Sequence, residues 1–308
     1  MERKFKIEVP VLLIGFNRPD IIKQSLENIR QYHPQKLYIT IDGPREGNQD
    51  DLCNVSEVRR IVEEIDFCKN IKYKINEENK GCEVTVSSGI AWVLEKEEYV
   101  IVLEDDVIVH ESFFRFVQEM LELYKNDDRI AMVSGCNYTP MKFPNDEDYC
   151  FCQSGHISGW ATWRRVWKDY NLHEVVKADY LSLDYLRTVS PNREIAKARL
   201  KEFKWIKSRG KDINWDFMFG YFRITRKMLS IVPRSHLTSN VGVFGLHGNG
   251  LTKAHFLPID DNFIVRKHPK EVIWNKQYDI YHFNKWIKTP FYKRFLLRIK
   301  RILHKLFN

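Results

Sequence analysis

Short, wholly apolar runs alternate with longer segments of mixed polarity along the first half of the chain. Apolar runs of this length predict strands buried on both faces, and the mixed segments repeat apolar residues with a helical period. Proline at position 19 fits the first turn of a helix. The pattern predicts strands at 9–16, 37–41, 71–75, 100–109, 130–133 and 229–232, and helices at 21–29, 55–65, 84–94 and 112–124. This alternation indicates βαβ units and an α/β fold with a mostly parallel sheet flanked by helices.

Three consecutive carboxylates, Glu104, Asp105 and Asp106, interrupt the apolar run 100–109. Charged side chains are rarely buried unless they are paired or bind a metal, so these three are expected to emerge at a strand end and meet a cation. Ligands of α/β proteins bind at the carboxyl ends of the strands, where carboxylate oxygens suit a hard divalent cation carrying a diphosphate. The alternative is a solvated turn between two strands.

Polar residues also follow the first two predicted strands. Asn17 and Arg18 end the first strand and Asp42 ends the second, so all three are expected at the same sheet edge as the carboxylates. An arginine and an aspartate there could recognise a base and a ribose, although an aspartate before glycine is equally consistent with a turn. Lys80, in the turn 79–81, joins these donor-binding candidates. No glycine-rich phosphate loop follows the first strand, which leaves a metal to handle phosphates.

A tryptophan-rich segment follows at 156–167. Trp160, Trp163 and Trp167 would share one face of a helix, and Gly159 at its start would permit close approach of the backbone to a ligand. The ring of Trp160 could be a platform for the apolar face of a sugar. An aromatic stripe at helical spacing is also typical of a protein core.

Asp216 lies among aromatic residues in the segment 212–222, which is apolar nearly all round and predicts a buried helix. Desolvation there would raise the pKa of Asp216 into the range of a general base, and a hydrogen-bonded structural aspartate is the alternative. The glycine-rich segment 239–250 could form a lid, from which His247 could reach a metal or a diphosphate.

The basic charge of the chain is concentrated at its C-terminal end. The net charge is +8, and six of the 49 Lys and Arg residues lie in 291–308, which leaves 43 basic against 41 acidic residues for 1–290. On a helical wheel these six cations oppose an apolar face, as in helices that lie in an anionic leaflet. A nearly neutral body argues against a nucleic-acid partner. A C-terminal helix docked on the body is the alternative.

The mean hydropathy of −0.44 and the absence of a long apolar stretch exclude a polytopic membrane protein. We therefore expect a protein of the cytoplasm, peripheral on the cytoplasmic face of the cell membrane. The expected organisation is a catalytic domain at 1–260 and a C-terminal extension at 261–308, with the basic amphipathic helix at about 290–308. The irregular region from about 140 to 210 is expected to be an elaboration on the substrate side.

Together these residues resemble the GT-A glycosyltransferases, and within them the N-acetylglucosaminyltransferase I-like group. The resemblance runs from about residue 9 to 250 and rests on the order and spacing of its parts. They are Pro10-Val11-Leu12 through Asn17-Arg18, Asp42, the Glu104-Asp105-Asp106 form of the DxD motif, Gly159-Trp160, Trp215-Asp216 and the loop with His247-Gly248. It implies a GT-A, Rossmann-like fold and an inverting transfer from a nucleotide sugar, a UDP-sugar in particular, to a glycan or lipid-linked acceptor.

The resemblance also implies roles for single residues. Asp106 would bind Mn²⁺ or Mg²⁺, Glu104 and Asp105 would contact the donor sugar and ribose, and Arg18 and Asp42 would hold the uracil. Asp216 would be the base that deprotonates the acceptor hydroxyl. The basic C-terminal helix, in place of an N-terminal anchor, resembles bacterial enzymes that build lipid-linked surface polysaccharides.

Two other functions fit parts of the sequence. A sugar-phosphate nucleotidylyltransferase uses a similar sheet, but it should carry a basic, glycine-rich loop after the first strand. A catalytically silent scaffold at the membrane surface would keep the fold without the chemistry, and retention of both the acidic triplet and Trp215-Asp216 argues against it.

Overall fold

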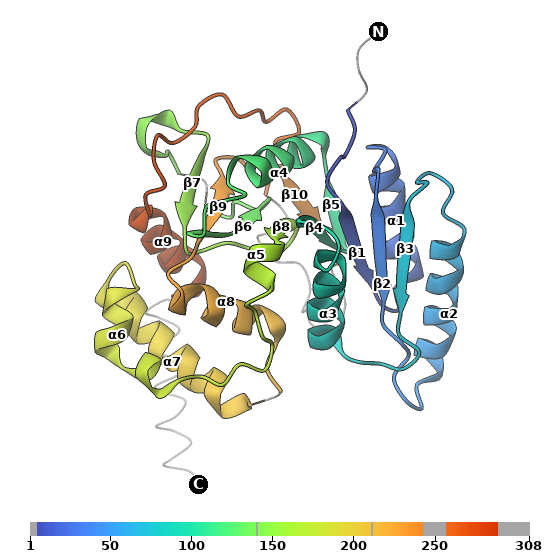
Figure 1. Cartoon of the computed structure of the whole chain (residues 1–308), viewed down its shortest axis with the longest axis horizontal. Coiled ribbons are helices and arrows are strands. Elements are labelled where there is room, and N and C mark those ends of the chain that lie inside the picture. The colour runs from blue at the N-terminus through green and yellow to red at the C-terminus, as the bar shows by residue number, and fades with distance from the viewer. Residues whose placement is uncertain (1–4, 140, 211, 243–256, 289–308) are drawn as a thin grey trace, which may run out of the picture.

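The computed structural model describes residues 5–139, 141–210, 212–242 and 257–288. Its centre is an eight-stranded sheet in the order β3-β2-β1-β4-β8-β6-β9-β7 (Figure 1). Strands β3, β2, β1 and β4 are parallel neighbours, as are β6 and β9, while β8 and β7 run antiparallel to the strands beside them. The predicted α/β fold with a mostly parallel sheet is therefore confirmed.

The apolar runs form the strands because both faces of the sheet are covered. Every residue of β1 (Val11–Gly15) and β2 (Leu37–Ile41) is buried, as expected for central parallel strands. The other strands of the large sheet are β3 (Ile71–Ile75), β4 (Tyr99–Glu104), β6 (Ile130–Ser134), β7 (Tyr149–Cys152), β8 (Trp160–Trp163) and β9 (Leu229–Pro233).

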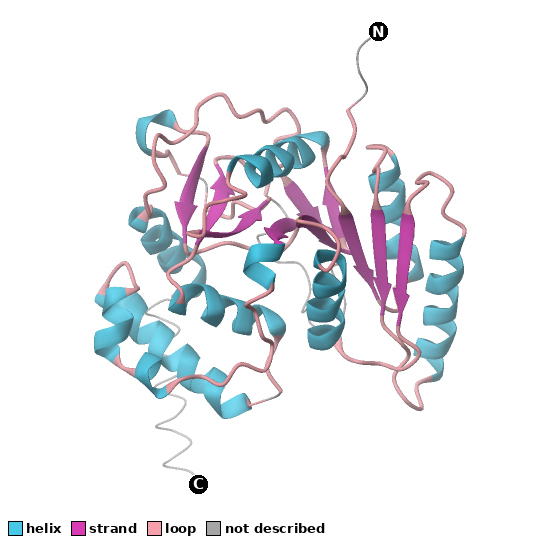
Figure 2. Ribbon diagram, in the orientation of Figure 1, coloured by secondary structure: helices cyan, strands magenta, loops and turns pink. Residues whose placement is uncertain are grey.

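Helices pack on both faces of this sheet (Figure 2). In the parallel half, α1 (Pro19–Arg30) packs against α2 (Gln49–Glu63), and α3 (Cys82–Leu94) packs on β1, β2 and β4. Helix α4 (Glu111–Leu123) covers β6 and β8. The remaining helices are α5 (Arg164–Trp167), α6 (Leu183–Thr188), α7 (Arg193–Arg209), α8 (Trp215–Thr225) and α9 (Lys276–His282).

The structure corrects two predicted elements. The run 100–109 is not one strand, because the chain turns at Asp105 and Asp106 and continues as β5 (Val107–Val109), which pairs antiparallel with β10 (Thr238–Asn240). The chain therefore turns between two strands, as in the alternative considered above, but Asp105 in that turn is buried rather than solvated. The segment 160–163 is strand β8 rather than helix, and only the four residues of α5 after it are helical.

The region from 140 to 210 is more regular than its sequence pattern suggested. It contains β7, β8, α6 and the 17-residue helix α7. Helix α7 begins at an Asn192 cap whose side chain accepts a hydrogen bond from the Ile195 amide.

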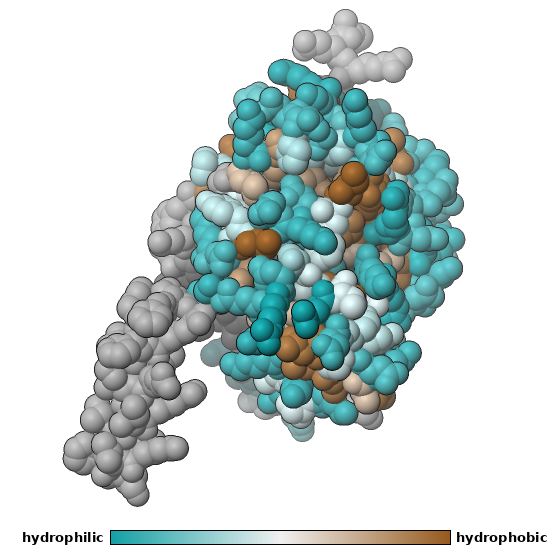
Figure 3. Space-filling model, turned by 90° about the vertical axis from the view of Figure 1, so that its left-hand side faces the viewer, coloured by the Kyte–Doolittle hydropathy of each residue, from teal (hydrophilic) through white to brown (hydrophobic). Residues whose placement is uncertain are grey.

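The described part of the C-terminal extension packs beside β7. The Asn275 amide donates to the Phe151 carbonyl at 2.7 Å, and the Asp279 carboxylate accepts hydrogen bonds from the amides of Gln153 and Ser154. The face near β7 and α9 is mostly hydrophilic, with small separate apolar spots (Figure 3). A domain boundary at residue 260 stays a prediction.

The predicted basic helix at about 290–308 and His247 lie outside the described residues. Within the described ranges, no helix combines the length and the apolar character needed to cross a bilayer.

Candidate functional site

The carboxyl ends of β1, β2 and β4 meet at one edge of the sheet, because these strands are parallel and adjacent. Asn17 and Arg18 follow β1, Asp42 follows β2, and β4 ends at Glu104. The structure therefore brings the predicted donor-binding residues of three strands to a common edge. In open α/β sheets this edge is where ligands bind.

Arg18 is the cation that meets the acidic triplet. Its guanidinium pairs with the carboxylate of Asp105 through Nη2 and Nε, and Nη2 also lies 3.1 Å from Oδ2 of Asp106. The side chain of Arg18 is 27% exposed, that of Asp106 is 14% exposed and that of Asp105 only 5%. The resemblance places Arg18 at the uracil of the donor, whereas in the structure its guanidinium is held against the carboxylates.

The three carboxylates have different environments. Burial, opposed by Arg18, raises the pKa of Asp105 to about 6. Burial, followed by the charges of Asp106 and Asp105, raises the pKa of Glu104 to about 8, so this side chain is largely protonated at neutral pH and can donate a hydrogen bond. The turn is thus not a solvated one, and the side chain of Asp106 is more exposed to a ligand than that of Asp105.

Asp106 is held from the other side by the end of β10, a contact that the sequence did not predict. Asn240 donates through Nδ2 to Asp106 Oδ1 at 3.1 Å, and the Val241 amide donates to the Asp106 carbonyl at 2.8 Å. Gly242 follows so closely that a Cβ on it would lie 2.1 Å from Asp106 Oδ2. The glycine-rich segment was noticed in the sequence, but its pairing with β5 depends on the long-range register of two short strands.

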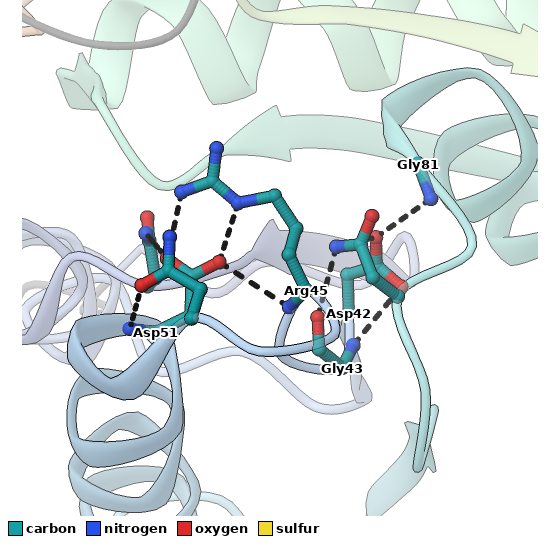
Figure 4. A network of polar contacts seen from close by, with 8 residues as sticks. Asp42, Gly43, Arg45, Asp51 and Gly81 are labelled. Carbon is teal, nitrogen blue, oxygen red and sulfur yellow. Dashed lines mark hydrogen bonds and ion pairs between the residues drawn. The ribbon is translucent and has the colours of Figure 1, made fainter.

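Asp42 anchors a loop rather than facing open solvent. Its buried carboxylate accepts hydrogen bonds from the amides of Gly43, Lys80 and Gly81 and from the side chains of Asn76 and Asn79, at 2.9–3.0 Å (Figure 4). These contacts occupy the lone pairs of both oxygens. The turn interpretation of Asp42 therefore describes this structure, and recognition of a base by this carboxylate stays a prediction.

Two other donor-binding candidates make contacts of their own. Lys80 binds Asp42 through its backbone amide, while its half-exposed ammonium lies 3.2 Å from Glu78. Asn17 donates through Nδ2 to Asp51 at 2.7 Å, so it fixes the loop after β1 to the start of α2.

Asp51 is the centre of a network that the sequence did not reveal (Figure 4). Its carboxylate, 1% exposed, accepts hydrogen bonds from Nε and Nη2 of Arg45 at 2.5 and 2.8 Å. These bonds to Arg45 hold the pKa of Asp51 at about 2. The guanidinium of Arg45 also lies 5.7 Å from the ring of Phe16, which fixes an arginine beside the residues that follow β1.

Asp216 is exposed, in contrast to the desolvated base predicted from its neighbours. Helix α8 turns Trp215, Met218, Phe219 and Phe222 into the core, at the i, i+3, i+4, i+7 spacing of one helix face. Asp216, in the first turn, lies outside that stripe. The burial of Trp215 and Phe219 therefore did not extend to Asp216.

Asp216 nevertheless belongs to the same edge as the triplet. Helix α8 packs against α3, whose first residue is Cys82. Burial and then the charges of Glu104, Glu83 and Asp216 raise the pKa of Cys82 to about 12. The charge of Asp216 also contributes to the raised pKa of Glu104. The charge of Asp216 on α8 is thus close enough to the end of β4 to act on Glu104.

Gly159 and Trp160 both pack against other parts of the protein. Gly159 has φ +77°, and a Cβ on it would lie 2.7 Å from Thr238, so its close backbone approach is to β10. Trp160 has no exposed surface, and its ring stacks on Trp215 at 5.8 Å and 18°. The core alternative considered for Trp160 is what the structure shows, and its ring is not open to a sugar.

Asp106 fits a divalent cation that a diphosphate helps to hold. Within the described ranges, no group of three or more His, Cys, Asp or Glu side chains could enclose a metal ion. Mg²⁺ in phosphate-handling enzymes uses one or two carboxylates together with waters and substrate phosphates, rather than a cage of protein ligands. A partly exposed Asp106 carboxylate, beside the Arg18 cation, suits that arrangement.

Comparisons with known proteins show limited similarity. No family model and no curated protein matches the sequence. The mannosyltransferase PcManGT from Pyrobaculum calidifontis, in complex with GDP-Man and Mn²⁺, is 18% identical with a TM-score of 0.37, and the match covers 52% of this chain and 46% of that chain. This chain thus spans less than half of that protein.

Two further structures are similar over comparable lengths. HddC from Yersinia pseudotuberculosis is 10% identical with a TM-score of 0.34, and the match covers 53% of this chain and 80% of that one. CMP:2-keto-3-deoxy-manno-octonic acid synthetase, complexed with CTP, is 12% identical with a TM-score of 0.31, covering 54% and 79%. At these TM-scores the similarity does not establish a function for this chain.

Proposed function

We propose that this chain is a metal-dependent, inverting glycosyltransferase that moves a sugar from a nucleotide donor, a UDP-sugar, to a hydroxyl of a glycan or lipid-linked acceptor. The observation that carries the proposal is the division of labour at the sheet edge. Asp106 and Asp105 form a polar turn with Arg18 at the end of β4, and Asp216, in the first turn of α8, is near enough for its charge to act on Glu104 at that strand end. The metal-binding candidate and the candidate base thus come from different elements.

An inverting displacement needs these two parts and no covalent nucleophile. One carboxylate must take the proton of the acceptor hydroxyl, which is the proposed role of the exposed Asp216. The negative charge of the departing diphosphate must be balanced, and Asp106 would hold the Mn²⁺ or Mg²⁺ that supplies Lewis-acid stabilisation there. Arg18, already beside Asp106, adds a second positive charge. Glu104, at the end of β4 beside Asp106, would contact the donor sugar.

We change three of the roles that the resemblance implied, the first being that of Arg18, which moves from the uracil to the diphosphate. Asp105 is almost wholly buried against Arg18, so we assign it to positioning that guanidinium. Asp42 is assigned to fixing the loop 76–81 beside the nucleotide. Asn17 and Lys80 remain candidates for the border of the donor site.

The decisive experiment combines donor binding with two substitutions. A thermal-shift screen of nucleotide sugars with Mn²⁺ should raise the melting temperature for the correct donor. Asp106→Ala should abolish donor binding and transfer, whereas Asp216→Asn should keep the donor-dependent shift and lose transfer. Full transfer activity in Asp216→Asn would contradict the mechanism, and a lack of metal-dependent binding of any nucleotide sugar would favour the silent scaffold.

The reaction products distinguish a glycosyltransferase from the nucleotidylyltransferase alternative. That enzyme would release pyrophosphate from UTP and a sugar phosphate, while a glycosyltransferase would release UDP from a UDP-sugar. A role in bacterial surface polysaccharide synthesis at the cytoplasmic membrane face remains part of the proposal and rests on the sequence of 291–308.

A further inference from the structure

A row of aromatic rings lies beyond the carboxyl end of β6. Tyr138 is its centre, with ring centroids 4.2 Å from His156, 5.4 Å from His236 and 5.7 Å from Trp286. His156 in turn lies against His282, with their Nε2 atoms 2.8 Å apart. These five residues come from four separate segments: the end of β6, the loop before β8, the β9–β10 connection and the C-terminal extension.

The row combines ring faces with polar edges at a partly open surface. Tyr138, His156 and Trp286 are partly exposed, whereas His236 and His282 are buried behind them. Trp286 is fixed by a 2.8 Å hydrogen bond from Nε1 to the Tyr138 carbonyl. Aromatic side chains of this kind offer an apolar face and a hydrogen-bonding edge together, which matches the C–H face and hydroxyl rim of a sugar ring.

The histidines of this row are neither charged near pH 7 nor arranged to bind a metal. Burial lowers the pKa of His236 to about 4 and that of His156 well below its usual value, so both rings are neutral near pH 7. In the described parts of the chain, no group of three His, Cys, Asp or Glu residues is arranged to hold a metal. His156 and His236 are therefore neutral rings, and each bonds within the protein through one nitrogen, to His282 and to the Asn137 amide respectively.

Strand β10 connects the row to Asp106. Cys136, two residues before Tyr138, lies 3.1 Å from Thr238 Oγ1, and Asn240 of the same strand donates to Asp106. Residues two apart on a strand point to the same side and are roughly 7 Å apart. Burial raises the pKa of Tyr138, and the charge of Asp106 is among the further contributions. The row and the proposed metal site are thus connected through the three residues of β10.

We propose that Tyr138, His156 and Trp286 form the acceptor subsite and bind a pyranose ring of the acceptor glycan. This inference rests on the proposed glycosyltransferase function and deepens it. The subsite lies on the β6 side of Asp106, whereas the donor-binding candidates lie on the β1 and β2 side, so donor and acceptor would approach Asp106 from opposite halves of the sheet.

The test compares Trp286→Ala with Trp205→Ala, a matched control because Trp205 is a 41% exposed tryptophan on α7 away from the row. Methyl glycosides of glucose, galactose, mannose and N-acetylglucosamine are the acceptor probes. Trp286→Ala should raise the KM for the active glycoside about tenfold or more, and leave donor affinity and acceptor-free UDP release unchanged. Trp205→Ala should match the wild type in every measurement. An unchanged acceptor KM in Trp286→Ala overturns the subsite.

A second arm does not depend on transfer. Titration of the metal-free protein with the same glycosides should quench tryptophan fluorescence, and Trp286→Ala, but not Trp205→Ala, should lose that quenching. If wild-type protein shows no donor binding yet retains Trp286-dependent quenching, the proposed function fails and the sugar subsite stands. If no glycoside quenches the wild type and acceptor KM is insensitive to Trp286, the subsite is refuted while the donor chemistry is untouched.

Discussion

Replacement of Gly242 by alanine puts a methyl group where the Asp106 carboxylate lies. A Cβ at position 242 would be 2.1 Å from Asp106 Oδ2 and 2.8 Å from its Cγ, whereas ordinary contact begins at 3.4 Å. The carboxylate or the chain after β10 must therefore move by about 1.3 Å. Arg18 and Asn240 hold the carboxylate, and the Val241 amide bonds to the Asp106 carbonyl, so either shift disturbs the surroundings of Asp106.

A shift of this size matters because Asp106 is the proposed metal ligand. Displacement of a positioning group by about 1 Å can cost on the order of 10²-fold in rate. We therefore expect Gly242→Ala to lower kcat/KM for transfer by about 10²-fold, equivalent to about 2.7 kcal/mol of transition-state stabilisation. The apparent affinity for Mn²⁺ should fall with it, since the same carboxylate would hold the ion.

The assay is UDP release and glycoside transfer across a range of Mn²⁺ concentrations, with circular dichroism to show that the fold persists. Gly220→Ala is the control, because Gly220 lies in α8 with nothing within 4 Å of an added Cβ. That variant should keep full activity and gain about 0.5–1 kcal/mol of stability. A folded Gly242→Ala protein with wild-type kcat/KM and Mn²⁺ dependence would refute the placement of the metal at Asp106.

Three further predictions test other parts of the structure. Asp51→Asn should lose about 1–2 kcal/mol of unfolding free energy at pH 7, a modest loss because solvent screens the partly exposed Arg45. Because the pKa of Asp51 is lowered to about 2, the difference from wild type in a urea titration should be present above pH 3.8 and vanish as the pH falls through 2. Equal stability of the two proteins at pH 7 would contradict this prediction. Trp160→Ala should cost about 3–5 kcal/mol by urea unfolding, since the ring is wholly buried, and a loss under 1 kcal/mol would argue for a role in binding instead. Deletion of 291–308 should abolish co-sedimentation with anionic vesicles while transfer to a soluble glycoside persists, and unchanged co-sedimentation would refute the membrane helix.

The sequence determined most of the regular structure in the first half of the chain. Strands β2 and β3 lie at the predicted residues, and α1, α3 and α4 differ from prediction by one or two residues at their ends. The local spacing of apolar residues is enough to predict these elements, because both faces of a central parallel sheet must be apolar. The placement of Arg18, Asp42 and the triplet at one edge followed from the same βαβ order.

Tertiary structure decided what each of these polar groups contacts. The sequence predicted that the triplet needs a cation, but only the adjacency of β1 and β4 makes that cation Arg18. Likewise, Asn240 reaches Asp106 through a three-residue pairing of β10 with β5 that no local pattern encodes.

Tertiary structure also decided which aromatic side chains are covered. The tryptophans at 160–167 carry helical spacing, yet the chain is extended at Trp160 because it pairs with both β4 and β6. Trp215 and Phe219 turn into the core on α8, whereas Asp216 lies outside that buried stripe and is exposed. The sequence thus specified which residue types meet at the edge of the sheet. Their partners and exposure depend on strand pairing and helix rotation between distant segments, which the packing of the whole core sets.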